Sequence, residues 1–137
     1  MSDDQREELA RVMTEALALC AACVQQTAAV AASLRGPLAA AEGPVTELNL
    51  AGFAHLQRLV AKVAEAGVAR PYEVPGPIRP EPDLAGLIRL EESALAALHA
   101  IIPESGESAD AEALEHLVEH FLLTKRELIE LLRRLAG

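Results

Sequence analysis

A proline-rich segment in the middle of the chain limits the folds that the chain can adopt. Within residues 70–82 the prolines are Pro71, Pro75, Pro77, Pro80 and Pro82. Proline interrupts a helix because it lacks an amide proton and its ring clashes with the preceding turn. An extended proline-rich segment advances about 3.1 Å per residue, so this segment can cover roughly 40 Å. A helix of about 24 residues is roughly 36 Å long, so the segment can run the full length of a helical bundle.

Apolar residues recur at helical spacing in four segments, two on each side of the proline-rich segment. We expect helices at about 3–35, 46–69, 83–102 and 109–136. The connections within each pair are short, which suits antiparallel helix hairpins. Two hairpins joined by one long crossover is the connectivity of ferritin-like bundles. The sequence therefore predicts one all-α domain over residues 1–137, an antiparallel four-helix bundle with a long crossover at 70–82.

The charge balance narrows the classes of partner. The formal net charge is −9, and an acidic chain without a basic patch argues against binding to nucleic acid or to an anionic membrane surface. The first residues lack the basic and apolar regions of a secretory signal, and no uninterrupted apolar run reaches transmembrane length. We therefore expect a cytoplasmic protein, in which the two cysteines are reduced.

Two polar residues interrupt apolar stripes that should face the core. Glu91 falls on the stripe of the third helix, and His55 falls between Leu48 and Leu59 on the second. A buried carboxylate or imidazole costs several kcal/mol unless it is paired, protonated or metal-bound. Helical bundles build their sites from such inward-facing polar residues, so these two positions predict a site in the core.

The chemistry of this site has several alternatives. Glu91 could be neutral, with its pKa raised by burial, or it could pair with His55, Arg89 or Arg126. His55 could be a neutral core histidine with a hydrogen bond to a neighbouring helix, or a ligand to a metal or a small molecule. Acid–base catalysis by Glu91 would need a substrate that the sequence does not identify.

Other metal-binding residue types give weaker signals. Cys20 and Cys23 lie inside an alanine-rich helix, where a cysteine packs as a small hydrophobe and a Cys-x-x-Cys spacing is a weak redox motif. His116 and His120 share one helix face and could hold a metal. Their alternation with glutamates instead indicates a solvated or partner-facing surface.

Four segments together resemble the bacterioferritins. Residues 13–27 resemble the first helix of that family, 52–67 the second, and 90–95 the third. Residues 124–127 resemble, more weakly, the Glu-x-x-His motif of the fourth helix. The resemblance implies a ferritin-like fold and places six positions of this chain on the ligands of a di-iron centre.

The same resemblance implies that the di-iron centre is degenerate. It places Cys20, Gly52 and Thr124 where the family has glutamates, and Glu127 where it has the last histidine. His55 and Glu91 keep the family's residue types. The glutamates missing at Gly52 and Thr124 are the two that bridge the metals in the family, so a normal ferroxidase centre is not expected.

We therefore expect a remodelled core that binds one metal ion or a small ligand, more in keeping with a binding protein than with an enzyme. Cys20, Gly52, His55, Glu91 and Thr124 would line it. A single iron or zinc ion would be held by a set of Cys, His and Glu side chains. The members of that set are His55, Glu91, Cys20 and Glu127.

Two alternatives have different consequences. One is a mononuclear iron oxidase or oxygenase. The other is a metal-free pseudo-ferritin that serves as a structural or interaction protein. In each case we expect a homodimer, because the apolar faces of the first two helices are wider than one bundle core needs.

Overall fold

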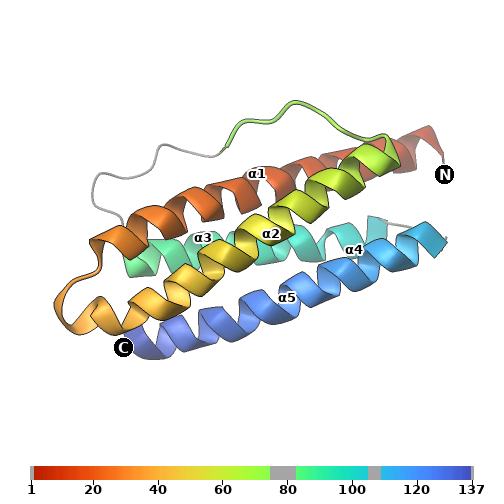
Figure 1. Ribbon diagram of the computed structural model, residues 1–137. Coiled ribbons are helices and arrows are strands. Elements are labelled where there is room, and N and C mark those ends of the chain that lie inside the picture. The colour runs from red at the N-terminus through yellow and green to blue at the C-terminus, as the bar shows by residue number, and fades with distance from the viewer. Residues whose placement is uncertain (1, 75–82, 105–108, 137) are drawn as a thin grey trace.

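Four long helices form the body of the protein and pack as a bundle (Figure 1). The computed structural model describes residues 2–74, 83–104 and 109–136. Its elements are α1 (Asp3–Ser33), the 3-10 helix η1 (Gly36–Ala41), α2 (Glu42–Ala66), α3 (Leu84–His99), the short α4 (Ile101–Glu104) and α5 (Ala109–Ala136). The described residues contain no strand, so the all-α class is confirmed for them.

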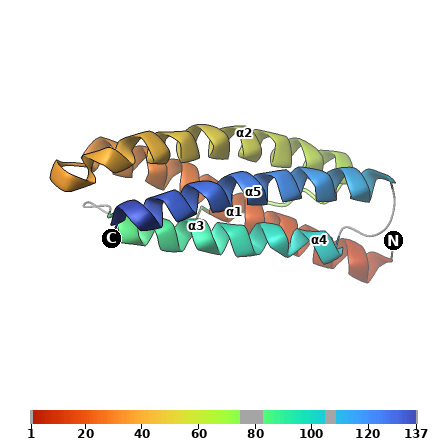
Figure 2. The same cartoon turned by 90° about the horizontal axis from the view of Figure 1, so that it is seen from below.

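The helices form two antiparallel pairs, as Figures 1 and 2 show. α1 runs antiparallel to α2, and α3 runs antiparallel to α5. α1 packs against α2 and α3, and α5 packs against the same two helices. α2 ends at the end of the bundle where α1 begins, and α3 begins at the opposite end. Part of the expected crossover, residues 75–82, lies outside the described residues.

Local signals explain where the helices begin and end. Ser2 and Gln5 form a capping box at the start of α1, in which each side chain accepts a hydrogen bond from the other residue's backbone amide. The side chain of Asp83 caps α3 by accepting a hydrogen bond from the amide of Gly86. Gly67 ends α2 in the left-handed conformation, with φ of 69°, which a residue without Cβ adopts at little cost.

Two helices differ from the expected bounds. α2 begins at Glu42 rather than near residue 46, because Pro44 falls in the first turn, where its missing amide proton has no intrahelical partner to lose. The third helix is interrupted at Ala100, and the chain continues as α4. Neither difference moves the residues of the candidate site.

The core consists of two apolar clusters, one toward each end of the bundle. The first includes Met13, Leu98 and Phe121. The second includes Val45 and Leu132. Every one of these five side chains is at most 1% exposed, so both clusters contribute the burial of apolar surface that stabilises the bundle.

Candidate functional site: a buried polar layer

Between the two apolar clusters, each of the four long helices contributes a buried polar residue or a thiol. These residues are Cys23 and Thr27 on α1, His55 on α2, Glu91 on α3 and Lys125 on α5. On every helix they fall between a residue of the first cluster and a residue of the second. We call this set the polar layer.

The centre of the polar layer is an ion pair between α3 and α5. The Nζ atom of Lys125 donates a hydrogen bond to Oε2 of Glu91 over 2.6 Å. The two side chains are 4% and 1% exposed, respectively, so neither charge is solvated and each depends on the other. The second carboxylate oxygen of Glu91, Oε1, is buried and has no hydrogen-bond partner among the described residues.

The charge of Glu91 keeps Lys125 protonated. Burial alone would lower the pKa of Lys125, because it disfavours the charged amine. The negative charge of Glu91, with further contributions from Cys23 and Cys20, outweighs burial and raises the pKa above its usual range. The core therefore holds a permanent ammonium group at neutral pH.

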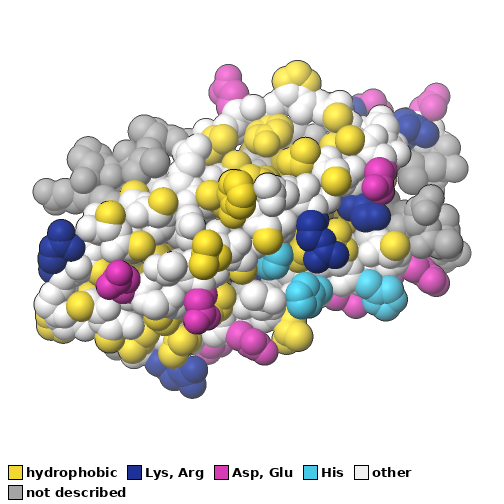
Figure 3. All heavy atoms as spheres, viewed as in Figure 1, with side chains coloured by type: hydrophobic (Ala, Val, Ile, Leu, Met, Phe, Trp, Pro, Cys, Tyr) yellow, Lys and Arg dark blue, Asp and Glu magenta, His cyan; other side chains and the backbone are white. Residues whose placement is uncertain are grey.

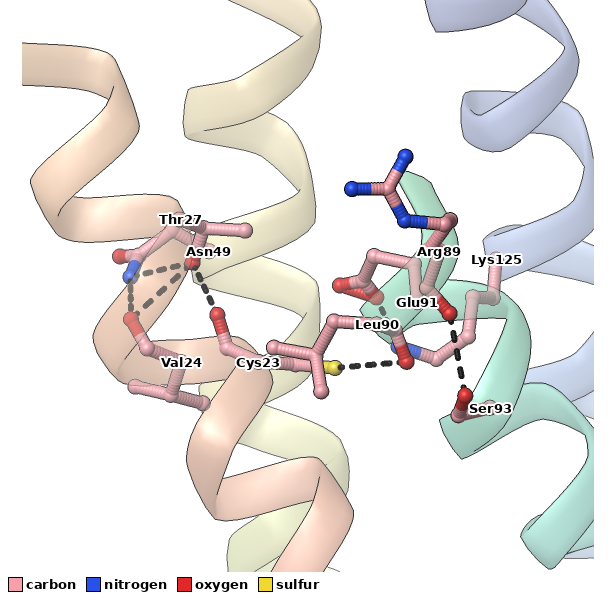
Figure 4. A network of polar contacts seen from close by, with 9 residues as sticks. All are labelled: Cys23, Val24, Thr27, Asn49, Arg89, Leu90, Glu91, Ser93 and Lys125. Atoms are coloured by element: carbon pink, nitrogen blue, oxygen red, sulfur yellow. Dashed lines mark hydrogen bonds and ion pairs between the residues drawn. The ribbon is translucent and has the colours of Figure 1, made fainter. Parts of the chain in front are cut away.

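The two cysteines on α1 are buried thiols. Burial raises the pKa of Cys20 to about 11 and raises that of Cys23 well above its usual value, with the charge of Glu91 acting in the same direction. The Sγ atom of Cys23 lies 3.9 Å from the carbonyl oxygen of Leu90 (Figure 4). Both cysteines are unpaired and protonated at neutral pH, which is the form that neither binds metals nor attacks electrophiles.

A second group of hydrogen bonds joins α1 to α2 next to the ion pair. The side-chain amide of Asn49 donates to the carbonyl oxygen of Val24 over 2.9 Å and to Oγ1 of Thr27 over 3.0 Å. The Thr27 hydroxyl in turn donates to the carbonyl oxygen of Cys23 over 2.8 Å. This network satisfies the buried threonine without any exogenous ligand (Figure 4).

His55 packs as part of the core. Its ring stacks on Phe121 with centroids 4.0 Å apart and lies edge-on to His120 at 6.3 Å. Burial, followed by the charges of Lys125, His120 and Arg58, lowers the pKa of His55 to about 4. The imidazole is therefore neutral at physiological pH.

The remaining predicted site residues are placed as follows. Gly52 is buried, and a Cβ at that position would make an ordinary van der Waals contact with Cγ2 of Val24, at 3.6 Å. Thr124 is half-buried, and Glu127 is exposed. His116 is exposed and lies 3.8 Å from a carboxylate oxygen of Glu119.

The predicted metal ligands do not gather around one point. Among the described residues, no group of three or more histidine, cysteine, aspartate or glutamate side chains is arranged to hold a metal ion. Glu91 belongs to the polar layer and Cys20 to the first apolar cluster, but the group that contacts the carboxylate of Glu91 is the Lys125 ammonium.

Lys125 is the residue that sequence reasoning missed. The predicted alternative partners of Glu91 were His55, Arg89 and Arg126. Its partner in the structure is Lys125, which precedes Arg126 in the chain. The available signal was a gap in a stripe on α5: Val118, Leu122, Ile129 and Leu132 are buried at helical spacing, and position 125 completes them.

Comparison of the chain with protein-family models, curated proteins and solved structures gives no match. Within the described ranges, one helix is long and apolar enough to cross a membrane by length and composition, namely α1. Half of its apolar window is buried inside the bundle.

Proposed function

We propose that the chain is a ferritin-like bundle in which a fixed internal ion pair takes the place of a metal, and that it works as a metal-free interaction protein. The observation that carries this proposal is the 2.6 Å hydrogen bond from the Lys125 ammonium to Glu91. It favours the pseudo-ferritin alternative over metal binding in the core.

Electrostatics supports the proposal that the core binds no metal. A divalent cation bound to Glu91 would lie a few ångströms from the positive charge of Lys125, and such a repulsion amounts to several kcal/mol even at an effective dielectric constant of 20. The raised pKa of Lys125 depends on the free carboxylate of Glu91, so a cation that neutralised the carboxylate would also have to displace the Lys125 proton or its ammonium group. The metal would have to expel a buried side chain.

The surrounding residues offer little to offset that cost. The thiols of Cys20 and Cys23 have raised pKa values and would have to lose their protons. Glu127 points into solvent. The same argument weighs against the mononuclear oxidase or oxygenase alternative, which depends on bound iron.

The unpartnered Oε1 atom of Glu91 is the one feature that favours a ligand in the core. A single free acceptor suits a small hydrogen-bond donor such as water. It does not supply the three or four ligands that a zinc or iron site requires.

The helix arrangement supports the ferritin-like assignment. The two antiparallel pairs, with α2 and α3 running in the same direction (Figure 1), require a long return between them. The segment 70–82 has the length for it. This is the connectivity expected of a bundle with one crossover.

The test is metal content after loading. Protein without a His-tag is incubated with ferrous iron under anaerobic conditions, or with zinc, then desalted and analysed by mass spectrometry. We expect well under 0.1 equivalent of either metal, and no oxygen consumption above that of free ferrous iron when air is admitted. About one equivalent of metal that disappears in Glu91→Gln would overturn the proposal.

A further inference from the structure

We propose that the outer face of α1 and α2 binds a second copy of this chain, with α2 antiparallel to α2 of its partner and Gln57 at the two-fold axis. The proposal deepens the proposed function, since it names the partner of the interaction protein. It rests on three features of this face: exposed apolar side chains, an absence of charge, and a self-complementary order of large and small residues.

Large apolar side chains project from α2 into solvent. Leu50, Phe53 and Val60 are 65%, 52% and 46% exposed, respectively. With Gln57 they fall at spacings of three and four residues, which places them along one face of the helix. An exposed apolar row of this kind marks an interaction surface more often than a scattered single residue does.

Charge is absent from the middle of the same face. Residues 16–34 on and just beyond α1 contain no charged side chain, and neither do residues 48–57 of α2. The hydrogen bonds of Asn49 to Val24 and Thr27 show that these two stretches lie side by side. Figure 3 shows hydrophobic and uncharged side chains gathered over the two helices, with Lys and Arg side chains directly beside this area.

The neutral area approaches what a stable dimer needs. The uncharged stretch of α1 is about 27 Å long and that of α2 is about 15 Å long, and each helix is about 10 Å wide. The flat footprint is therefore about 420 Å², and the relief of the side chains increases the accessible area. A standard interface buries about 800 Å² on each partner, so one copy laid along this face would bury an area of the right order.

The order of residues along α2 argues for a second copy rather than an unrelated partner. In an antiparallel pair centred on Gln57, each large side chain lies opposite a small one. The facing positions are Leu50 and Ala64, Phe53 and Ala61, and Val60 and Ala54. The three alanines are exposed, like the larger residues that they would face. Helix pairs pack closely when large and small residues alternate across the interface in this way.

Electrostatics also selects this face for self-association. Two copies that each carry a net charge of −9 repel one another. They can approach most easily along the uncharged stretches, and residues 57–66, which face residues 48–57 in this register, add only Arg58, Lys62 and Glu65, of which the last two pair with each other. A dimer that forms through this face should therefore persist, or strengthen, at high ionic strength.

The first experiment measures the oligomeric state by sedimentation equilibrium from 1 to 100 µM. We expect a dimer for the unmodified chain and a dimerisation constant weakened at least 10-fold in Phe53→Glu. The matched control is Leu123→Glu, which places the same charge at an apolar residue on α5 that is 57% exposed. It should remain dimeric. A monomer at 100 µM, or equal weakening by both substitutions, would contradict the proposal.

The second experiment tests the register. Gln57→Cys should cross-link to itself with a short bismaleimide, because the two-fold axis brings the two copies of this residue together. Thr46→Cys, also exposed on α2, should not, because the antiparallel register places its two copies far apart. Cross-linking of Thr46→Cys without cross-linking of Gln57→Cys would rule out the register. A chain that is monomeric and sediments with neutral phosphatidylcholine vesicles would instead assign the face to membrane binding. Metal content does not enter either measurement, so this inference and the metal-free function can fail separately.

Discussion

Glu91 and Lys125 are 34 residues apart in the sequence, and their side chains meet in the core at 2.6 Å. Each is almost fully buried. Replacing a buried ion pair by apolar residues can be neutral or stabilising, whereas removing one partner leaves an uncompensated buried charge. The energetic consequences of the pair therefore depend on whether one or both residues are changed.

Lys125→Met should lower the free energy of unfolding by about 3–5 kcal/mol, because it leaves the Glu91 carboxylate buried without its cation. Glu91→Leu should be destabilising for the same reason, since it strands the ammonium. The double variant Glu91→Leu/Lys125→Met should recover most of the loss. Urea denaturation of the four proteins measures the coupling, and a double variant no more stable than either single one would argue against it.

The stability of the bundle should fall on mild acidification because of His55. Its pKa is lowered from 6.5 to about 4 in the folded protein, so the unfolded chain takes up a proton at this residue first as the pH decreases. The contribution of neutral His55 is thus present above pH 6.5 and is lost progressively as the pH falls toward 4. We expect about 1–2 kcal/mol, reduced from the full effect because solvent reaches one edge of the ring.

Denaturant unfolding of the unmodified chain and of His55→Gln at pH 7.5 and pH 4.5 measures this contribution. The unmodified chain should lose more stability than the variant between the two values. His116→Gln, a change at an exposed histidine that does not contact His55, serves as the control and should retain the pH dependence. Equal losses in all three proteins would mean that His55 titrates normally.

The two thiols should resist modification in the folded protein. Cys20 and Cys23 are buried and have raised pKa values, so the reactive thiolate is both scarce and inaccessible. We expect reaction with iodoacetamide at pH 8 to be slower by at least about 100-fold in buffer than in 6 M guanidinium chloride, because only unfolding exposes them. Rapid labelling of either cysteine under native conditions would indicate an open core.

Asn49 should contribute measurably to the packing of α1 on α2. Asn49→Ala removes both hydrogen bonds to α1 and should lower the free energy of unfolding by about 1–3 kcal/mol. Thr46→Ala is the control, since it changes an exposed polar residue on the same helix and should have little effect. Thermal unfolding followed by circular dichroism compares the two, and similar losses would exclude a specific role for Asn49.

The sequence predicted the helices well because their signals are local. Apolar residues at helical spacing, together with the Ser2 cap and the Asp83 cap, place the four long elements. The start of α2 was predicted about four residues late, at 46 rather than Glu42, although the first turn of a helix tolerates Pro44. The burial of Glu91 and His55 also followed from their places on apolar stripes.

The identity of the partner of Glu91 could not be read in the same way, because it depends on the rotation of α5. Thr124, which the resemblance placed at the site, and Leu128 are half-buried, while the residues that are fully buried include Lys125 and Ile129. A shift of one residue turns a helix by about 100°. A stripe that includes only apolar residues leaves out Lys125, although Lys125 is the buried residue that completes the stripe.

The ion pair in the core bears on how a metal site could be introduced into this bundle. A Cβ at position 52 would make an ordinary van der Waals contact with Cγ2 of Val24, at 3.6 Å, so that position does not itself oppose a larger side chain. A cation at Glu91, in contrast, requires the loss of the Lys125 ammonium that now contacts the carboxylate. Removing Lys125 alone leaves the carboxylate buried without a cation. A path to metal binding by single substitutions therefore begins with an unstable intermediate, and a designer would have to replace Lys125 and introduce the new ligands together.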